Sequence, residues 1–384
     1  MSARLSGIDA ARGTALLGMM ATHALPLWDP ATGDPTAAAL IFSGRSSALF
    51  ALLAGVGLAL LTGGRNPGGS SPRPRAGIAV RAVIIALVGL TLGGLDVSIA
   101  VILFHYAVLF LLALPFVLMP LRRVAAWAAG WVLLSPVAAY LVRPWLGDVV
   151  SPRDVPGNIT WDAFAHPATL AADVFFTGFY PAVQWLSYLL VGLAIGRLDL
   201  RRLNTQLGLL FVGVGAAAGA KLASWWLLGP LGGFAALEGT DSGRRWPLSR
   251  MLEVNFSAVD QSGSWWWLAT SAPHSGTTLD LVHTAGCAAA VLGACLLLTR
   301  RANVLLPLSA AGAMTLTLYS LHVWAMSVLD AQDPLPDPYL VFWAQAAAAV
   351  LIGLLFVRLG SRGPLEMVAS GASRAASESV PVRR

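Results

Sequence analysis

Long apolar stretches separated by short polar segments recur along the whole chain. Each of ten such stretches is about long enough to cross a bilayer core of roughly 30 Å as an α-helix. They cover residues 8–27, 44–62, 77–95, 98–119, 122–143, 181–199, 205–228, 279–299, 303–329 and 338–359. Because helices satisfy their own backbone hydrogen bonds in lipid, the pattern predicts an all-α, polytopic membrane bundle of about ten transmembrane helices. The fourth stretch, which His105 and Tyr106 interrupt, is compatible with either one long helix or a short re-entrant piece followed by a span.

The composition indicates a membrane protein and excludes an ordinary soluble one. Hydrophobic residues make up 57% of the chain and charged residues only 11%, with a mean hydropathy of +0.70. In this arrangement most of the 25 basic residues lie on the membrane side that holds the N-terminus, whereas only four acidic residues lie there, Asp9, Asp199, Glu366 and Glu378. The positive-inside rule therefore predicts a multi-pass protein of the inner (plasma) membrane with both termini in the cytoplasm. The net charge of +6 follows from this topology, and no nucleic-acid partner is expected.

Residues 1–368 are expected to form a single membrane domain. Two long loops, near residues 144–180 and 229–278, face the side opposite to the termini, and long loops in compact proteins are often functional. The polar segment 369–384 predicts a disordered cytoplasmic tail. We find no internal repeat of the kind that marks many transporters.

Arg12 and His23 lie eleven residues apart in the first apolar stretch. On an α-helix this spacing is about three turns, so both side chains project from nearly the same face, roughly 16 Å apart along the axis. Ionisable groups inside a membrane helix are costly and usually serve a function in a protein interior or a watery cavity. A structural alternative stays open for each residue: His23 can hydrogen-bond between helices, and Arg12 can pair with Asp9 three residues earlier.

The sequence around these two residues resembles the first helix of the transmembrane acyltransferase superfamily. The segments that carry the similarity are RLSGIDAARG (4–13), ALLGMM (15–20), FSGRSSALFALLAG (42–55), TLTLYSLH (315–322) and GPLE (363–366). The superfamily includes the heparan-α-glucosaminide N-acetyltransferase catalytic domain, the acyltransferase-3-type O-acyltransferases and the YeiB-like proteins, and the last two segments resemble the closing motifs of the YeiB-like group. An arginine followed after ten residues by a histidine is similar to the O-acyltransferase signature, whereas the glucosaminide branch often carries asparagine in place of that histidine.

This resemblance implies a membrane-embedded acyltransferase that moves an acyl group, expected to be acetyl, from cytoplasmic acyl-CoA to a glycan or glycolipid at the outer face. Acyl transfer needs a base for the acceptor proton or a nucleophile that carries the acyl group, and His23 suits either role near neutral pH. Acyl-CoA is a polyanion, so Arg12, with Arg75 and Arg81 as neighbours, is expected to bind its phosphates. The histidines and cysteines show no ligand spacing, so no metal is expected.

Further residues are candidates for acceptor binding, each beside a structural alternative. Arg45 enters the second stretch in the company of serines, and it either lines a cavity or extends to the surface. Tyr319 and His322 share one polar stripe of the ninth stretch, which helix-to-helix hydrogen bonding explains equally well. The same two interpretations apply to His105. Trp246, in a tryptophan-rich outer loop, suits the flat face of a sugar, although a belt of interfacial aromatic residues is the default explanation.

Two other classes of function stay open on the sequence alone. A multi-pass transporter is compatible with the many spans, but it more often shows internal repeats and paired broken helices. A non-catalytic membrane scaffold would leave the intramembrane arginine and histidine unexplained. The expected partners are the lipid bilayer, acyl-CoA and a glycan or glycolipid acceptor, and the sequence is compatible with a homodimer.

Overall fold

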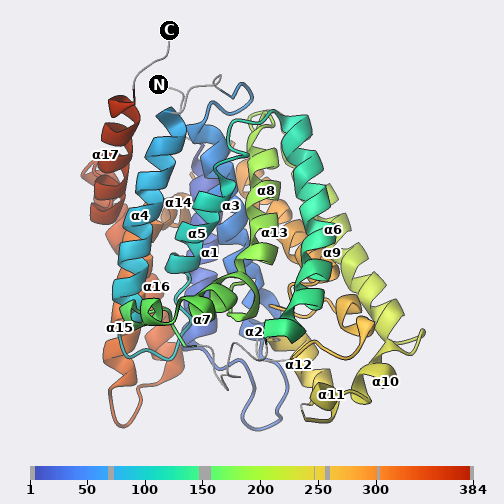
Figure 1. The fold of residues 1–384 in the computed structure, drawn as a ribbon. Coiled ribbons are helices and arrows are strands. Elements are labelled where there is room, and N and C mark those ends of the chain that lie inside the picture. Colours follow the sequence, from blue (N-terminus) through green and yellow to red (C-terminus); the bar gives the residue numbers. More distant parts are fainter. Residues whose placement is uncertain are drawn as a thin grey trace.

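In the computed structural model, residues 5–67, 73–146, 157–245, 247–255, 260–300 and 303–380 are described. Over these residues the protein is all-helical (Figure 1), with one isolated bridge between Trp28 and Pro35. The helical elements are α1 (Ser6–Ala24), α2 (Ala37–Phe42), α3 (Arg45–Leu61), α4 (Arg73–Gly93), α5 (Leu103–Ala113), α6 (Leu121–Leu146), η1 (Trp161–Ala165), α7 (Pro167–Ala172), η2 (Asp173–Thr177), α8 (Ala182–Gly196), α9 (Leu203–Leu228), α10 (Gly233–Glu238), α11 (Asp241–Arg245), α12 (Leu248–Val254), η3 (Trp265–Ala269), α13 (Thr278–Leu298), α14 (Leu306–Gly312), α15 (Thr315–Asp330), α16 (Pro338–Arg358) and α17 (Pro364–Ser379). The prediction of an all-α fold is confirmed for this part of the chain.

Six of the described helices are long and apolar enough to cross a membrane, so this is a multi-pass integral membrane protein. The number rises to eight if each of two bent helix pairs forms one span. One pair joins residues Pro167–Thr177 to α8 with a bend of 50°, and the other joins α14 to α15 with a bend of 81°. The ten spans expected from the sequence, and the orientation of the termini, stay predictions.

The fourth apolar stretch, residues 98–119, forms a much shorter helix than its hydropathy indicates. Within it, α5 covers only Leu103–Ala113, which at 1.5 Å per residue is roughly 16 Å, about half of a bilayer core. The helix ends before Pro115 because proline lacks the backbone N–H that would continue the hydrogen-bond pattern of the helix. Of the two alternatives for this stretch, one long helix is therefore wrong.

Helix α1 lies in the interior of the bundle, where it packs against α3, α13, α14 and α16. Figure 1 shows α4, α15, α16 and α17 to one side of it and α6 and α9 to the other. Glycines allow its closest contacts. A side chain at Gly13 would overlap the carbonyl oxygen of Leu308, and one at Gly312 would overlap that of Asp9. Such close packing of small residues drives helix association in membranes, and it fixes the position of α1 against α14.

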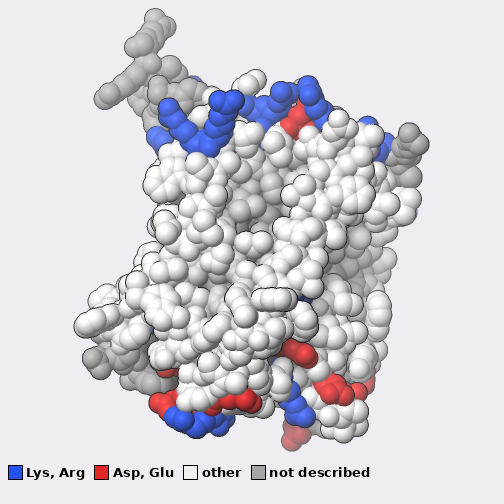
Figure 2. Space-filling model, turned by 90° about the vertical axis from the view of Figure 1, so that its right-hand side faces the viewer, with Lys and Arg blue, Asp and Glu red and all other residues white. Residues whose placement is uncertain are grey.

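The two ends of the bundle differ in structure and in charge. The chain termini lie at one end, and the short helices α7, α10, α11 and α12 lie at the other (Figure 1). On the face drawn in Figure 2, arginines gather at the end of the termini and acidic residues lie mostly at the opposite end. The surface between these ends carries few charges, as expected of a protein embedded in a bilayer.

Residues 369–379, which belong to the segment predicted from the sequence to be a disordered tail, lie in helix α17. It packs against α4, where a side chain at Gly77 would overlap the Ser377 hydroxyl. In addition, Nε of Arg73 donates a 2.9 Å hydrogen bond to the carbonyl oxygen of Val380. The composition of this segment is that of a disordered tail, but an amphipathic helix needs only one apolar face when a second helix covers it. Residues 381–384 lie outside the described part of the chain.

Candidate functional site

A cavity of about 170 Å³ lies among α1, α3, α4, α5, α15 and α17. We call it the arginine-side cavity. Its charged residues are Arg12 from α1, Arg81 from α4 and Glu366 from α17, and the side chains of Tyr106 and Tyr319 form part of its wall. The structure therefore brings Arg12, Arg81 and Tyr319 to one cavity from three distant parts of the sequence.

Arg12 takes part both in an ion pair and in this cavity. Its Nη1 lies 3.4 Å from Oδ1 of Asp9, and 30% of the arginine side chain is exposed. The absence of a side chain at Gly57 makes room for the guanidinium, since a Cβ there would lie 2.9 Å from Nη2 of Arg12. A guanidinium has five N–H donors, and one long contact with Asp9 leaves several of them for an anion in the cavity.

Arg81 projects from α4 into the same cavity. Its Nε is buried and has no hydrogen-bond partner among the described residues, although buried polar groups are almost always satisfied in native proteins. A buried, unsatisfied guanidinium donor beside a second arginine suits an anionic ligand. Arg75 has a different role: its Nε donates a 3.1 Å hydrogen bond to the carbonyl oxygen of Leu114. It joins α4 to the end of α5 and lines none of the cavities described here.

The carboxylate of Glu366, from the GPLE segment, caps the N-terminus of α15. Its Oε1 accepts hydrogen bonds from the backbone N–H groups of Leu316 (2.7 Å) and Thr317 (3.2 Å), and its Oε2 accepts one from the Thr317 hydroxyl (2.6 Å). N–H groups in the first turn of a helix have no partner inside it, and the helix dipole favours a carboxylate there. One side chain therefore joins α17 to α15 at the wall of the arginine-side cavity.

A second cavity, of about 220 Å³, lies at the other end of α1. We call it the histidine-side cavity. His23 from the last turn of α1, Tyr180 before α8 and His274 before α13 line it, together with Ser46 and Ser47 from α3. The two cavities have no lining residue in common. Helix α1 contributes to both, with Arg12 in one and His23 in the other.

His23 is the first of three hydrogen-bonded side chains. Its Nδ1 lies 2.9 Å from Nε2 of His322 on α15, 299 residues later in the sequence. The Nδ1 of His322 lies 2.5 Å from Oε1 of Gln345 on α16. The two imidazole planes are 6° apart and their centroids are 5.2 Å apart, which agrees with rings joined edge to edge. Gln345 is not among the residues predicted from the sequence, although a single glutamine within an apolar stretch is a signal that could have identified it.

His274 adopts an unusual backbone conformation in the wall of the histidine-side cavity. Among the described residues it is the non-glycine residue with a positive φ, 64°, and such conformations often mark functional positions. Its ring packs against those of Phe179 and Trp185, with centroid distances of 4.4 and 6.1 Å. Burial lowers the pKa of His274 to about 4, so the ring is neutral at physiological pH. His274 is not among the predicted site residues because no motif in the loop sequence distinguishes it.

Of the residues predicted to bind the acceptor, two lie away from the walls of both cavities and a third falls outside the described part of the chain. Nε of Arg45 donates a 3.2 Å hydrogen bond to Nε2 of His283, so Arg45 joins α3 to α13. His105 is buried on α5 against Tyr180, at a centroid distance of 5.7 Å, and both of its ring nitrogens lack a partner among the described residues. Trp246 lies outside the described residues. Within the described part of the chain, no group of three or more His, Cys, Asp or Glu residues is arranged to hold a metal.

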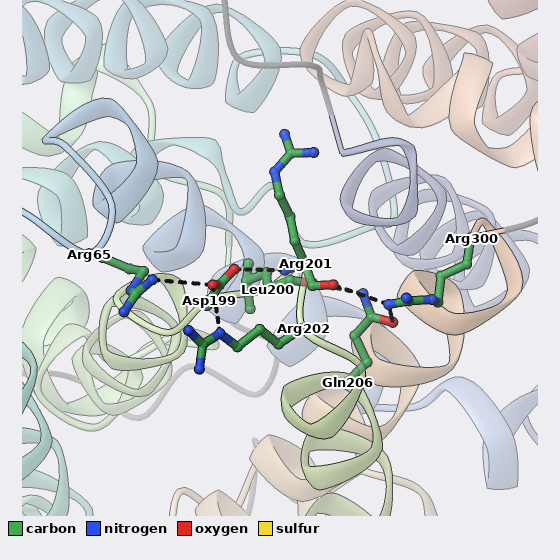
Figure 3. A network of polar contacts seen from close by, with 7 residues as sticks. All are labelled: Arg65, Asp199, Leu200, Arg201, Arg202, Gln206 and Arg300. Carbon is green, nitrogen blue, oxygen red and sulfur yellow. Dashed lines mark hydrogen bonds and ion pairs between the residues drawn. The ribbon is translucent and has the colours of Figure 1, made fainter.

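A third cavity, of about 500 Å³, lies beside the start of α1, and Arg12 also forms part of its wall. A polar network borders it and joins the turns after α3, α8 and α13 (Figure 3). Oδ2 of Asp199 accepts hydrogen bonds from Arg65 (3.2 Å) and Arg202 (3.0 Å). The remaining residues of the network are Leu200, Arg201, Gln206 and Arg300. Positive charge is thus concentrated where the arginine-rich end of the bundle meets α1.

Comparison with known protein families identifies the chain. Residues 4–221, more than half of its length, match the family described as heparan-alpha-glucosaminide N-acetyltransferase, catalytic. The chain belongs to this family. A comparison with curated proteins finds no match. The resemblance inferred from the sequence is confirmed, and the protein is a multi-pass membrane protein with a catalytic domain of the heparan-α-glucosaminide N-acetyltransferase family.

The heparan-α-glucosaminide N-acetyltransferase match runs from α1 into α9, so it includes Arg12, His23 and Arg81. Other residues of the site come from beyond the matched region. His322 belongs to α15 and Glu366 to α17. The last helices of the chain therefore complete the arginine-side cavity, and beyond the family match the histidine-side cavity is lined by His274, while His322 contacts His23.

Proposed function

We propose that this protein transfers an acyl group, acetyl in the simplest case, from cytoplasmic acyl-CoA to a glycan or glycolipid acceptor at the outer face of the membrane. The observation that carries the proposal is the placement of α1. This one helix contributes Arg12 to the arginine-side cavity and His23 to the histidine-side cavity. The residue proposed to bind the anionic donor and the residue proposed to act on the acceptor from the other side of the membrane therefore both belong to helix α1.

The arginine-side cavity supports the donor half of the proposal. Arg12 and Arg81 supply guanidinium groups, which bind phosphate through paired N–H donors. The cavity volume of about 170 Å³ is smaller than the roughly 300–1,000 Å³ typical of sites that enclose a drug-sized ligand. It therefore suits the narrow pantetheine arm, and we place the nucleotide part of acyl-CoA at the arginine-rich end of the bundle. Arg75, whose Nε is hydrogen-bonded to Leu114, is left out of this binding set.

The histidine-side cavity supports the acceptor half. The hydroxyl groups of Ser46, Ser47 and Tyr180 and the imidazole of His274 offer donors and acceptors that match the hydroxyl groups of a sugar. The ring of Phe179 adds an apolar face to the same wall. A small polar cavity with a histidine at its edge is the arrangement that acyl transfer to a hydroxyl or an amine requires.

His23 is assigned the role of general base. Its Nε2 takes the proton from the acceptor hydroxyl or amine while the acceptor oxygen or nitrogen forms a bond to the thioester carbonyl carbon. The tetrahedral intermediate then collapses, the C–S bond breaks, and the thiolate of CoA receives the proton from His23. Neutral His23 is regenerated, and the products are the acylated acceptor and CoA. A positioned base contributes roughly 10²- to 10⁴-fold to the rate.

The proposal includes a topology of ten crossings with both termini in the cytoplasm. The eight spans counted with the bent pairs, together with α1 and the stretch 98–119, make ten. In that stretch the short helix α5 is continued at both ends by buried non-helical residues, which are tolerated at membrane depth inside a protein. The arginines gathered at the end of the termini (Figure 2) support this orientation, because cytoplasmic loops carry an excess of Lys and Arg. The acyl-CoA side is then the arginine-rich side.

Sealed vesicles and labelled acetyl-CoA test this function. In inverted vesicles, which expose the cytoplasmic face, the label should pass from the acetyl group of acetyl-CoA to a glycan or glycolipid. Sealed right-side-out vesicles should show this transfer only after permeabilisation, and vesicles that lack the protein serve as the control. Permeabilised vesicles that contain an authentic acceptor and still show no acyl transfer would contradict the proposal. Vesicles that accumulate the acceptor without acylating it would indicate a transporter instead.

A further inference from the structure

We propose that Gln345 and His322 are positioning residues that hold His23 in one tautomer, with the proton on Nδ1 and the lone pair of Nε2 available to the histidine-side cavity. The consequence for catalysis rests on the proposed function. The tautomer itself is a property of the folded protein and can be measured without any acceptor. Both positioning residues lie beyond the region of the family match.

The direction of the hydrogen bonds is set at Gln345. Its Oε1 lies 2.5 Å from Nδ1 of His322, and its Nε2 lies 3.4 Å from the sulfur of Met326. An amide NH₂ group only donates and a thioether sulfur only accepts, so this orientation satisfies both ends of the amide. The amide oxygen only accepts, and His322 must therefore donate from Nδ1.

The next hydrogen bond follows from the number of protons on a neutral imidazole. Such a ring carries one N–H group, so His322, which donates from Nδ1, presents a lone pair at Nε2. Nδ1 of His23 lies 2.9 Å from this nitrogen and must donate to it. The nearly parallel planes and the 5.2 Å centroid distance agree with an N–H group that points along the plane of the partner ring. The lone pair of His23 is thereby assigned to Nε2.

The surroundings leave this nitrogen free to act as a base. Nε2 of His23 has no hydrogen-bond partner among the described residues, and the residue lines the histidine-side cavity. The titratable groups that contact the histidine pair or line its cavity are Tyr319 on α15, Tyr180 before α8 and His274 before α13. The other titratable groups of the same helices are Asp330 on α15, Asp9 and Arg12 on α1, and Tyr339 and Arg358 on α16. Of these, Asp330 accepts hydrogen bonds from Ser98. The chain of three side chains is therefore neutral at rest.

The hydrogen bonds from His23 through His322 to Gln345 stabilise the positive charge that develops on His23 during acyl transfer. When Nε2 takes the acceptor proton, His23 becomes an imidazolium, and its Nδ1–H group still donates to His322. A hydrogen bond with an ionised donor is roughly twice as strong as a neutral one. Gln345 has no direct contact with the acceptor in this arrangement, and it acts by keeping His322 ready to accept.

Nitrogen-15 spectra of histidine-labelled protein in lipid test the tautomer directly. A scalar coupling across the N–H···N hydrogen bond identifies the His23–His322 pair without any substitution, and the chemical shifts show which nitrogen of each ring carries the proton. We expect the proton on Nδ1 in both rings. A proton on Nε2 of His23, or the absence of a coupled pair, would overturn the proposal.

Substitutions at Gln345 test the consequence for the reaction. Gln345→Leu removes the acceptor for His322, so kcat should fall roughly 10- to 100-fold, the scale seen when a partner that orients a functional histidine is lost. The KM for acyl-CoA should stay unchanged, because Gln345 does not line the arginine-side cavity. Gln345→Glu keeps an acceptor oxygen and should retain the tautomer. Its negative charge favours the imidazolium, so the acid limb of the pH–rate profile should move to higher pH. Trp343→Leu, at an exposed position of the same helix, is the matched control.

The outcomes separate this inference from the proposed function. A folded Gln345→Leu protein with wild-type kcat would overturn the positioning role. If that variant does not fold, His322→Gln and His322→Leu replace it: the glutamine oxygen accepts from Nδ1 of His23, so only the glutamine variant should retain activity. Wild-type protein with the expected tautomer but no acyl transfer would reject the proposed function alone. Acyl transfer that depends on His23 in a protein with the opposite tautomer would reject the positioning role alone.

Discussion

Replacing His23 by alanine separates the chemistry of the site from the stability of the fold. The side chain makes one hydrogen bond among the described residues, to His322 at 2.9 Å, and such a bond contributes about 0.5–1.5 kcal/mol to stability. Loss of a positioned general base should lower the rate of acyl transfer at least about 100-fold, which corresponds to about 2.7 kcal/mol of transition-state stabilisation. We therefore expect expression, helicity and acyl-CoA binding close to wild type, with transfer largely abolished.

A second substitution sharpens this test. The amide of a glutamine at position 23 can donate to Nε2 of His322, but glutamine has no basic nitrogen. His23→Gln and His23→Ala should therefore be similarly inactive, while the glutamine variant keeps more of the stability. His166→Ala, at an exposed loop position, is the matched control. Single-turnover transfer from labelled acetyl-CoA in inverted vesicles measures the chemistry, and thermal melting in detergent measures the fold.

Two results would refute the reasoning on His23. Near-normal turnover of His23→Ala on an authentic acceptor would place the base elsewhere, with His322 and His105 next to be tested. Failure of both His23 variants to fold, while His166→Ala folds, would make a structural role the better account. In the wild-type protein, activity should also fall as the pH drops, because only a neutral imidazole accepts the proton.

Three further predictions concern the neighbouring residues. A hydrogen bond to a charged group contributes about 1.5–3 kcal/mol, so Arg12→Ala should raise the Kd for acyl-CoA about 10- to 100-fold. Arg12→Lys should restore only part of the affinity, because lysine lacks the paired N–H donors of arginine. An unchanged Kd for Arg12→Ala, measured by calorimetry, would limit Arg12 to a packing role. Glu366→Ala leaves three hydrogen-bond donors at the start of α15 without their acceptor, so it should destabilise the protein by about 1–3 kcal/mol, with Glu366→Gln between it and wild type. Identical melting curves for Glu366→Ala and wild type would show that water replaces the carboxylate at these donors. Burial lowers the pKa of His274 to about 4, below about 6.5 in an unfolded chain, so the unfolded state binds the proton first and stability should fall by up to roughly 3 kcal/mol as the pH drops from about 6.5 to 4. His274→Asn, which tolerates a positive φ, should flatten this dependence in thermal unfolding, and an unaltered slope would assign the acid sensitivity to other groups.

The membrane class, the helical fold and the family were accessible from the sequence alone. Hydropathy and length decide whether a segment can cross lipid, because each segment there must satisfy its backbone hydrogen bonds within a helix. The shared face of Arg12 and His23 was accessible for a similar reason, since the geometry of a single helix is local. The family resemblance depended on short motifs around these two residues, and the family match that confirms it begins at residue 4.

The ends and bends of the helices were not determined by hydropathy. Helix α5 ends at Ala113, the ninth apolar stretch divides into two helices bent by 81°, and residues 369–379 are helical rather than disordered. A hydropathy window averages over a proline, and composition alone does not show that α4 covers one face of α17. These features depend on local breaks and on neighbouring helices, so they appear only in the folded structure.

Only the tertiary structure decided which polar groups meet. Arg45 and Arg75 lie away from both cavities because His283 and a backbone carbonyl group bind them, whereas Gln345 reaches His322 from another helix. A contact between two helices depends on the rotation and depth of each, and these are set by the packing of small residues such as Gly312 over the whole bundle. The spacing along one helix therefore pointed to His23, while the partners that orient its ring depend on how α1, α15 and α16 pack together.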